Sequence, residues 1–385
     1  MKISEIKSIR PVFFVTLIIF FFASCNCYMK TDLGDESIDV SITRKKDAAE
    51  NTGIILSFNK VSSVLDIPTE LQGMPVVKVL FADATNMSSL ESIVIPDSVT
   101  EIDTFEKASS LKAVNLPDNL AYIPSFKECS NLSEIAIPAG IIEIPESCFE
   151  GCKKLTKIYK KSSGSSGSTS EGNQETNLTD SLEGIKIIGK RAFYNCSALS
   201  SIVLETTEIT ALEELTFYGC TSLSIIKLPS TIETIGAEVF NNCSALTTVE
   251  NFNLIAPLED DKIKPLGDKI FYSCKGLNSI TLNPQLKEIP KNMFNGCTSL
   301  KSFTIPEKIE KIGGSAFAGS ALNELFCYPV EPPAIEASSL PELKPKAESE
   351  ELFTLYLPAE SIQAYKDAWA KNIDWSLVGV KAIGE

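Results

Sequence analysis

The sequence predicts a mainly β solenoid with short helical turns, in which a coil of about 23 residues is stacked many times. The first observation is a phenylalanine that recurs at intervals of 21 to 24 residues, apart from two gaps of 44 and 31 residues. The second is a short segment after each phenylalanine, in which large apolar residues alternate with other residues as in a strand with one buried face. The recurring residues are Phe105, Phe126, Phe149, Phe193, Phe217, Phe240, Phe271, Phe294 and Phe317.

The repeating unit reads F-x-x-C-x-x-L-x-x-I-x-I-P, followed by two or three residues and then I-x-x-I-G/P, as in the copy from Phe294 to Ile312. The phenylalanine closes the coil, and L-x-x-I-x-I forms a strand. The proline ends that strand because it has no N–H for a ladder. The I-x-x-I segment forms the opposite wall. Eleven such strands, between Leu90 and Leu357, would stack in parallel into a ribbon roughly 48 Å long.

The composition of the 385-residue chain argues against several functions. Its net charge of −15 has the wrong sign for a nucleic-acid partner. It contains no histidine, which removes Ser-His, Cys-His and His-metal mechanisms. Carboxylates, lysines and cysteines remain possible catalysts, but no pattern combines them into a site. We therefore expect no catalytic residue, no cofactor and no bound metal ion.

The amino-terminal segment is typical of an export signal. Basic residues precede an apolar run from Val12 to Ala23, which is short for a membrane span. Small residues directly before Cys25 resemble the bacterial lipobox, in which the cysteine is acylated and becomes the first residue of the mature protein. The alternative is cleavage without a lipid. We predict a lipoprotein signal peptide over 1–24, membrane attachment only through the lipid on Cys25, and a flexible tether over 25–52.

The rest of the chain divides into repeats and two ends. An amino-terminal cap is expected over 53–89 and the repeats over 90–330. A Ser/Gly/Thr-rich insertion over 161–182 predicts a disordered loop. The carboxy-terminal cap is expected over 331–385, with an amphipathic helix over Ile362–Trp369.

Seven cysteines lie three residues after the coil phenylalanine and are expected to stack as a column inside the solenoid. A metal column, a chain of disulfides and simple packing of small thiols would each explain them. Ala108 and Ser320 occupy the same slot in other coils, which favours packing, because neither residue can replace a ligand or a bridge. A disulfide between Cys148 and Cys152, four residues apart, is the alternative for this pair. The seven are Cys129, Cys152, Cys196, Cys220, Cys243, Cys274 and Cys297.

Five aromatic residues are candidates for partner binding. Phe326 and Tyr356 lie at outward strand positions near the carboxy-terminal end, where the alternative is that the cap packs over both. Tyr194, Tyr218 and Tyr272 each follow a coil phenylalanine. They could line a flank that binds a partner, or they could simply shield the phenylalanine column, which we favour.

These motifs resemble the BspA-like class of leucine-rich repeats of bacterial cell-surface proteins, over about residues 54–385. The resemblance rests on the F-x-x-C-x-x-L-x-x-I-x-I-P unit, on I-x-x-I-G before the next phenylalanine, and on the closing Leu-Tyr-Leu-Pro-Ala-Glu-Ser segment. It implies a right-handed leucine-rich repeat solenoid with a parallel concave strand ribbon, capped at both ends. It also implies display at the bacterial cell surface and adhesion to host matrix proteins or to other cells.

Three functional hypotheses follow. The leading one is a non-enzymatic, membrane-anchored surface protein that presents its repeats to host or bacterial protein partners. The alternative is a surface lipoprotein that captures carbohydrate through exposed tyrosines. An enzyme is the remote third, and a cleft holding two carboxyl groups about 5–10 Å apart would be needed to support it.

Overall fold

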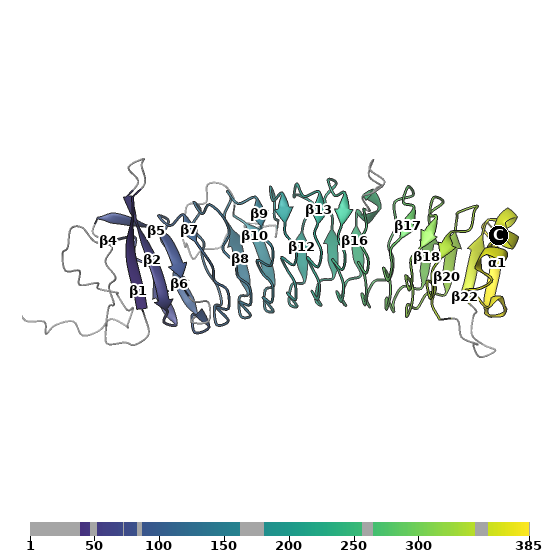
Figure 1. Ribbon diagram of the computed structural model, residues 1–385, viewed down its shortest axis with the longest axis horizontal. Helices are drawn as coiled ribbons and strands as arrows, with labels where there is room; N and C mark the ends of the chain where they lie inside the picture. The colour runs from purple at the N-terminus through teal and green to yellow at the C-terminus, as the bar shows by residue number, and fades with distance from the viewer. Residues whose placement is uncertain are drawn as a thin grey trace, which may run out of the picture.

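The computed structural model shows one elongated solenoid, with the carboxy-terminal helix at one end (Figure 1). The predicted signal peptide and Cys25 lie outside the described residues, as does most of the insertion expected over 161–182. The structure describes residues 39–46, 52–71, 73–82, 87–161, 181–255, 265–342 and 353–384.

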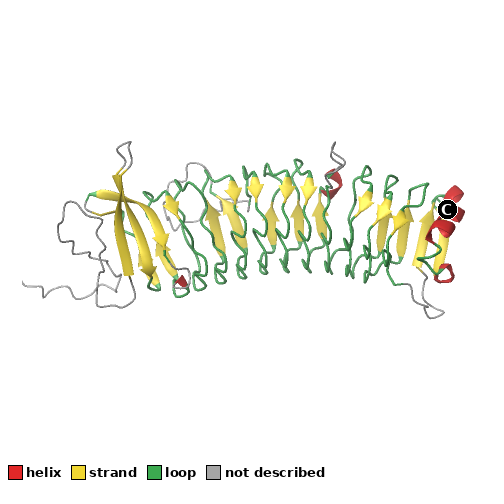
Figure 2. Ribbon diagram, viewed as in Figure 1, coloured by secondary structure: helices red, strands yellow, loops and turns green. Residues whose placement is uncertain are grey.

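Two walls of short strands run along the solenoid, and within each wall the paired strands are parallel (Figure 2). The first wall is the predicted ribbon and consists of β3 (Val64–Asp66), β6 (Ser92–Val94), β8 (Glu134–Ile137), β10 (Lys157–Lys160), β12 (Ser201–Val203), β14 (Ile225–Lys227), β16 (Thr248–Glu250), β18 (Ser302–Ile305), β20 (Glu324–Cys327), β22 (Phe353–Leu357) and β23 (Val378–Ala382). The second wall consists of β2 (Thr52–Lys60), β5 (Met74–Phe81), β7 (Glu101–Ile102), β9 (Glu143–Ile144), β11 (Ile187–Ile188), β13 (Ala211–Leu212), β15 (Thr234–Ile235), β17 (Glu288–Ile289), β19 (Lys311–Ile312) and β21 (Ala334–Ile335). The parallel solenoid predicted from the period is therefore confirmed.

Two of the eleven expected strands, over 111–116 and 277–282, do not form ladder-paired strands. Their inward residues still enter the core: Leu111 and Leu277 are buried. Coil geometry is thus kept where ladder pairing is interrupted. The first wall breaks into separate sheets at these two places and between β10 and β12, and the last sheet runs from β18 to β23.

A column of stacked phenylalanine rings forms the centre of the core. Eleven rings, from Phe58 to Phe317, follow one another with centroids 5.1–5.8 Å apart, and neighbouring rings are stacked except Phe81 and Phe105, which are tilted by 46°. The column therefore begins two coils before Phe105, inside the expected cap. Each pair adds roughly 0.5–1.5 kcal/mol to the free energy of burying the rings. Stacking therefore links every coil to both neighbours.

The turn that carries each phenylalanine is tighter than the short helical turn that the sequence predicts. Alternate N–H groups donate to the carbonyl three residues earlier, as Ala192 does to Gly189 at 3.2 Å, and those between them donate to the next coil, as Phe193 does to Thr216 at 2.9 Å. Arg191 and Asn195, two residues before and after Phe193, have positive φ values of 58° each. A left-handed residue cannot continue a right-handed helix, so the chain turns back here. Residues with positive φ recur two places before the column residue: Ser147, Leu215, Glu238, Lys269, Asn292 and Ser315.

The amino-terminal end is closed by strands rather than by a separate domain. β1 (Asp39–Lys46) pairs antiparallel with β2, and β4 (Glu70–Leu71) pairs antiparallel with β5. The structure therefore differs from the predicted tether over 25–52, because residues 39–46 form a strand. The reason is that β2 would otherwise be an open edge of the second wall, and β1 supplies its missing hydrogen bonds.

The carboxy-terminal end is closed by a helix, and α1 spans Ile362–Trp369 as the sequence predicts. Two of its side chains, Tyr365 and Trp369, are buried and donate hydrogen bonds of 2.8 Å to the carbonyls of Pro329 and Pro333. Short 3₁₀ turns flank this cap: η3 (Ala359–Ser361) and η4 (Trp375–Leu377). Another, η2 (Phe252–Leu254), follows β16. None of the helices within the described part of the chain is long and apolar enough to span a membrane.

The 161–182 insertion interrupts one coil rather than separating two. β10 ends at Lys160, and the chain re-enters the coil at Ser181, which forms a parallel bridge with Val203. Leu182, the last residue assigned to the insertion, is buried in the core. β10 and β11, on either side of the insertion, keep their pairing with β8 and β9.

Candidate functional site

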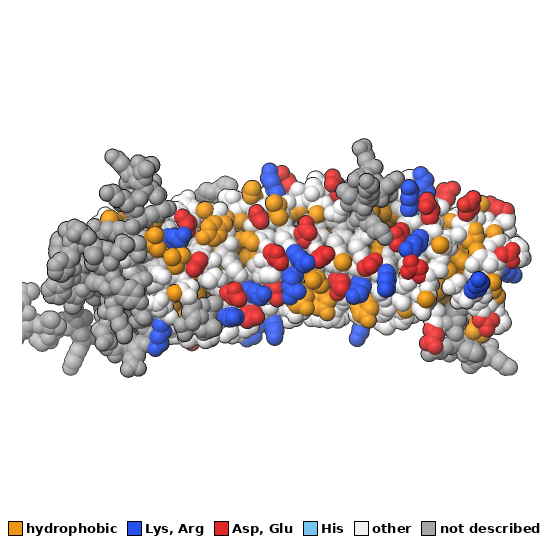
Figure 3. All heavy atoms as spheres, viewed as in Figure 1, with side chains coloured by type: hydrophobic (Ala, Val, Ile, Leu, Met, Phe, Trp, Pro, Cys, Tyr) orange, Lys and Arg blue, Asp and Glu red, His pale blue; other side chains and the backbone are white. Residues whose placement is uncertain are grey.

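The outward face of the first wall mixes both signs of charge, and Figure 3 shows acidic and basic side chains interspersed along the molecule. Lys227 illustrates the arrangement, with its Nζ 2.7 Å from Glu205 and 3.8 Å from Glu250 in neighbouring coils. Exposed pairs of this kind contribute little stability, about 0–1 kcal/mol each. They do neutralise the face locally, so the net charge is not concentrated into a site for a polyion.

Tyr194 and Tyr218 lie side by side in adjacent coils, with ring centroids 4.7 Å apart and an interplanar angle of 7°. The guanidinium carbon of Arg191 lies 4.0 Å from the Tyr194 centroid. Two groups this close cannot share one side of a ring, so Arg191 and Tyr218 cover opposite faces of Tyr194. Both tyrosines are half-buried beside the phenylalanine column, which supports the shielding role.

Arg191 is held in place by a carboxylate of the preceding coil. Its Nε and Nη2 donate to the two Glu150 oxygens at 3.0 and 2.9 Å, and Lys127 Nζ lies 3.4 Å from the same carboxylate. Hydrogen bonding from Arg191 lowers the pKa of Glu150 to about 2, against 4.5 for an ordinary glutamate. The cation over Tyr194 is therefore fixed by a bidentate ion pair.

Tyr272 does not extend this stack. The coil between Tyr218 and Tyr272 carries Asn241 at the equivalent position, directly after Phe240. Asn241 is 7% exposed and donates from Nδ2 to Glu238. The three tyrosines named by the sequence thus separate into a stacked pair and one isolated residue.

Phe326 and Tyr356 form a second stacked pair, with centroids 4.2 Å apart and an interplanar angle of 11°. The parallel register of β18, β20, β22 and β23 aligns Thr304, Phe326, Tyr356 and Lys381 in one row across the sheet. Lys381 Nζ lies 5.5 Å from the Tyr356 centroid. The sequence left open that the cap packs over both rings. In the structure, β23 of the cap lies against Tyr356, while the helix α1 packs elsewhere.

An exposed apolar cluster on the second wall went unnoticed in the sequence. Tyr122, Ile142 and Ile187 are 43%, 52% and 49% exposed and come from three consecutive coils. The N–H groups of Lys186 and Ile187 donate to the Ile142 carbonyl, which places the two isoleucines next to each other. We call these three residues the second-wall cluster. In the sequence, this cluster could have been recognised from apolar residues at outward positions of the I-x-x-I segment, next to the inward residues that build the wall.

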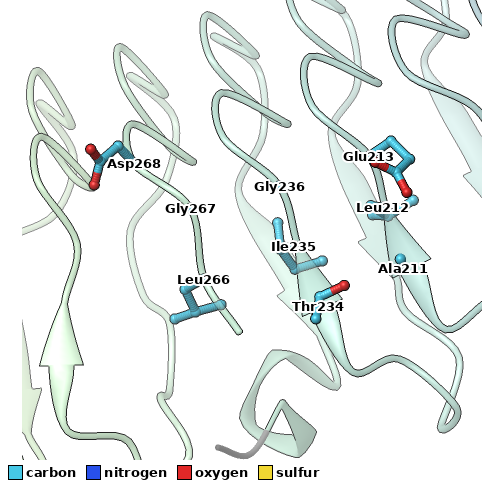
Figure 4. Close-up of a pocket in the computed structure, with 9 residues that line it drawn as sticks. All are labelled: Ala211, Leu212, Glu213, Thr234, Ile235, Gly236, Leu266, Gly267 and Asp268. Carbon is cyan, nitrogen blue, oxygen red and sulfur yellow. The ribbon is translucent and has the colours of Figure 1, made fainter. Parts of the chain in front are cut away.

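One surface pocket, with a volume of about 430 Å³, lies across three turns of the second wall. Figure 4 shows Glu213 and Asp268 on different coils, with the coil of Gly236 between them. Asp268 accepts a hydrogen bond of 3.1 Å from the Lys291 N–H. A Cβ on Gly236 would lie 2.7 Å from the Glu214 nitrogen, which explains glycine at this position of the repeat. The carboxylates do not converge on one point, as glycosidase-like chemistry would require.

The cysteine column lies inside the solenoid and supports the packing interpretation. All seven thiols are buried, and each donates to the carbonyl of a column phenylalanine in the preceding coil, as Cys220 does to Phe193 at 3.2 Å. Burial raises the pKa of Cys152 and of Cys297 to about 12, so these thiols are poor nucleophiles. Among the described residues, no three acidic or cysteine side chains converge as a metal site, and all nine cysteines are free.

Known proteins share this repeat. The family model described as a BspA type leucine rich repeat region matches in six copies, over residues 81–171, 166–260 and 253–330. No curated protein matches the chain.

Similar solved structures include a leucine-rich repeat protein from Bacteroides ovatus, at 21% identity and a TM-score of 0.45, covering 91% of this chain and 100% of that one. The pneumococcal vaccine antigen PcpA shares 18% identity at a TM-score of 0.42, covering 93% and 100%. A leucine rich cell surface protein from Faecalibacterium prausnitzii shares 20% identity at a TM-score of 0.41, covering 91% and 94%. With the family model spanning most of the repeats, the chain belongs to the BspA-type leucine-rich repeat family.

Proposed function

We propose that this chain is a non-enzymatic cell-surface protein that binds protein partners through its solenoid. The observation that carries the proposal is the second-wall cluster of Tyr122, Ile142 and Ile187. Exposed apolar side chains scattered singly need no explanation, but Ile142 and Ile187 are adjacent and Tyr122 is exposed in the preceding coil, so the three give this stretch of the wall an apolar surface. Such patches with an aromatic member are typical centres of protein–protein interfaces.

The surroundings of the cluster also suit a protein partner. Glu143 pairs in register with Ile187, and Lys186 Nζ lies 3.2 Å from Glu208, so charged groups border the apolar centre. A polar rim around an apolar centre excludes water from the contact and sets its orientation. The strands of the second wall continue along the solenoid in both directions, which offers area beyond the three residues.

The proposed partners are extracellular-matrix or cell-surface proteins of a host or of other bacteria. The test is surface plasmon resonance of the mature chain, carrying Cys25→Ser for solubility, over a panel of such purified proteins. We expect a double Ile142→Ser/Ile187→Ser variant to lose at least tenfold in affinity for the partner that binds. Ile225→Ser is the matched control, because Ile225 is 51% exposed on the other wall. Equal losses in both variants, or no binding partner, would sink the proposal.

Surface display is proposed to depend on a lipid at Cys25. The support is the small residues before this cysteine and the apolar run that precedes them. The measurement is metabolic labelling with a fatty acid in the producing bacterium. Label that survives Cys25→Ser would contradict the anchor without affecting the binding proposal.

Capture of carbohydrate by Tyr194, Tyr218 and Tyr272 is the alternative function, and the ring geometry argues against it at the first of these. A sugar stacks on the face of an aromatic ring, and both faces of Tyr194 are occupied, by Arg191 and Tyr218. Tyr272 does not stack on Tyr218, because the coil between them carries Asn241 at the equivalent position.

A further inference from the structure

An uncovered aromatic face stands on the first wall near its carboxy-terminal end. The 4.2 Å between the Phe326 and Tyr356 centroids is close to the spacing of neighbouring strands, about 4.8 Å. The rings must therefore stand upright on the sheet, with their faces directed along the row. Tyr356 covers one face of Phe326, and the next residue on the other side is Thr304, whose short side chain is exposed. The second face of Phe326 therefore looks out over the wall.

Small hydroxyl side chains form the floor in front of that face. Ser302 and Thr304 of β18 are both exposed, as are Ser279 and Thr281 at the equivalent outward positions of the preceding coil. The ring of Phe326 therefore projects from the sheet next to a surface of small hydroxyl side chains. We call Phe326 with these four residues the aromatic shelf. Figure 3 shows hydrophobic side chains gathered at this end of the molecule.

A carboxylate lies at the side of the shelf. Glu324 is paired in register with Ser302 and accepts a hydrogen bond of 3.2 Å from the Tyr356 hydroxyl through Oε1. That bond fixes the side chain and leaves Oε2 for another donor. The shelf thus offers a fixed acceptor, several hydroxyl groups and one ring face within a few residues.

These groups match one class of ligand. The face of an aromatic ring is electron-rich and attracts the weakly positive C–H bonds on the flat face of a pyranose. The hydroxyl and carboxylate groups then hydrogen-bond the rim of the sugar and set its orientation. Glu324 and the net charge of −15 disfavour anionic ligands. We propose that the aromatic shelf binds a pyranose ring of a neutral oligosaccharide, independently of the protein-binding cluster on the second wall.

The test is a glycan array of neutral oligosaccharides probed with the mature chain, followed by isothermal titration calorimetry with the strongest ligand. We expect binding to at least one neutral glycan and a loss of at least tenfold in affinity for Phe326→Ala. Thr304→Tyr is the second variant, because a new ring at this exposed strand position would stack on the free face and block it without altering the core. It should abolish binding while the melting temperature is retained.

Tyr194→Ala is the matched control, since it truncates an aromatic residue whose faces are both covered, and it should leave the glycan affinity unchanged. Absence of any neutral-glycan binding overturns the proposal, as does binding that survives both Phe326→Ala and Thr304→Tyr. Loss of protein binding alone in these variants would also overturn it, by assigning the shelf to a protein partner. The Ile142→Ser/Ile187→Ser variant should keep glycan binding, which separates failure of this site from failure of the proposed function.

Discussion

The two stacked aromatic pairs have the same local geometry and different surroundings. Tyr194 and Tyr218 are 4.7 Å apart, and Phe326 and Tyr356 are 4.2 Å apart, in each case between neighbouring coils. In the first pair Arg191 closes the outer face of Tyr194, whereas in the second Thr304 leaves the outer face of Phe326 uncovered.

The difference shows that a ring's neighbours, and not its residue type, decide whether it is available to a ligand. The Arg191 guanidinium is fixed by Glu150, so uncovering Tyr194 would also break a bidentate ion pair. Thr304 has no group that could reach over Phe326. One pair therefore belongs to the structure of the coil, and the other is free to bind.

The largest expected effect is a loss of folding stability in the phenylalanine column, compared with the loss in the first tyrosine pair beside it. Phe217→Ala should lower the free energy of unfolding by about 3–5 kcal/mol, because it leaves a cavity in the ring column. Tyr218→Ala should cost less, because this ring is only half-buried and its stacking contact adds only about 0.5–1.5 kcal/mol to the area that it buries. Urea denaturation of both variants measures the difference. A loss for Tyr218→Ala as large as that for Phe217→Ala would show that the tyrosine pair is part of the core.

A smaller effect concerns the ion pair that closes Tyr194. Glu150→Gln should cost about 1.5–3 kcal/mol at neutral pH, the value of hydrogen bonds to a charged group. The pKa of Glu150 is lowered to about 2 in the folded state, so its contribution is present above pH 4.5 and is lost as the pH falls towards 2. The wild type should therefore lose its advantage over Glu150→Gln across this window. Parallel stability curves of the two proteins from pH 6 to 2 would contradict the assignment.

The smallest effect concerns the cation beside the second pair. Lys381→Ala should change the free energy of unfolding by about 0.5–1 kcal/mol at most, because its Nζ is 5.5 Å from the Tyr356 centroid and the side chain is exposed. Arg191→Ala should cost more, since it also strips Glu150 of its bidentate partner. Thermal unfolding of both variants in one buffer gives the ranking. A reversed order would mean that the second pair, and not the first, depends on its cation.

Much of the fold could be predicted because inward positions obey a local rule that is repeated in every coil. Phe294, Cys297 and Leu300 are each fully buried, in the roles expected from the repeat. The helix Ile362–Trp369 was likewise predictable from its own amphipathic pattern. The positive φ at Arg191 was not, because the residue types at that position vary and only the hydrogen bonding between coils imposes the conformation.

The sequence by itself determined the period, the buried face and the internal column of thiols, since burial demands the same residue types in each coil. Only the tertiary structure decided that β1 closes the amino-terminal edge, that Ile142 and Ile187 lie next to each other, and that Phe326 keeps one face open. These features depend on the register between coils that are 20 to 45 residues apart in the chain. No residue in a single coil carries that information, because outward positions meet water or a neighbour according to how the coils are stacked.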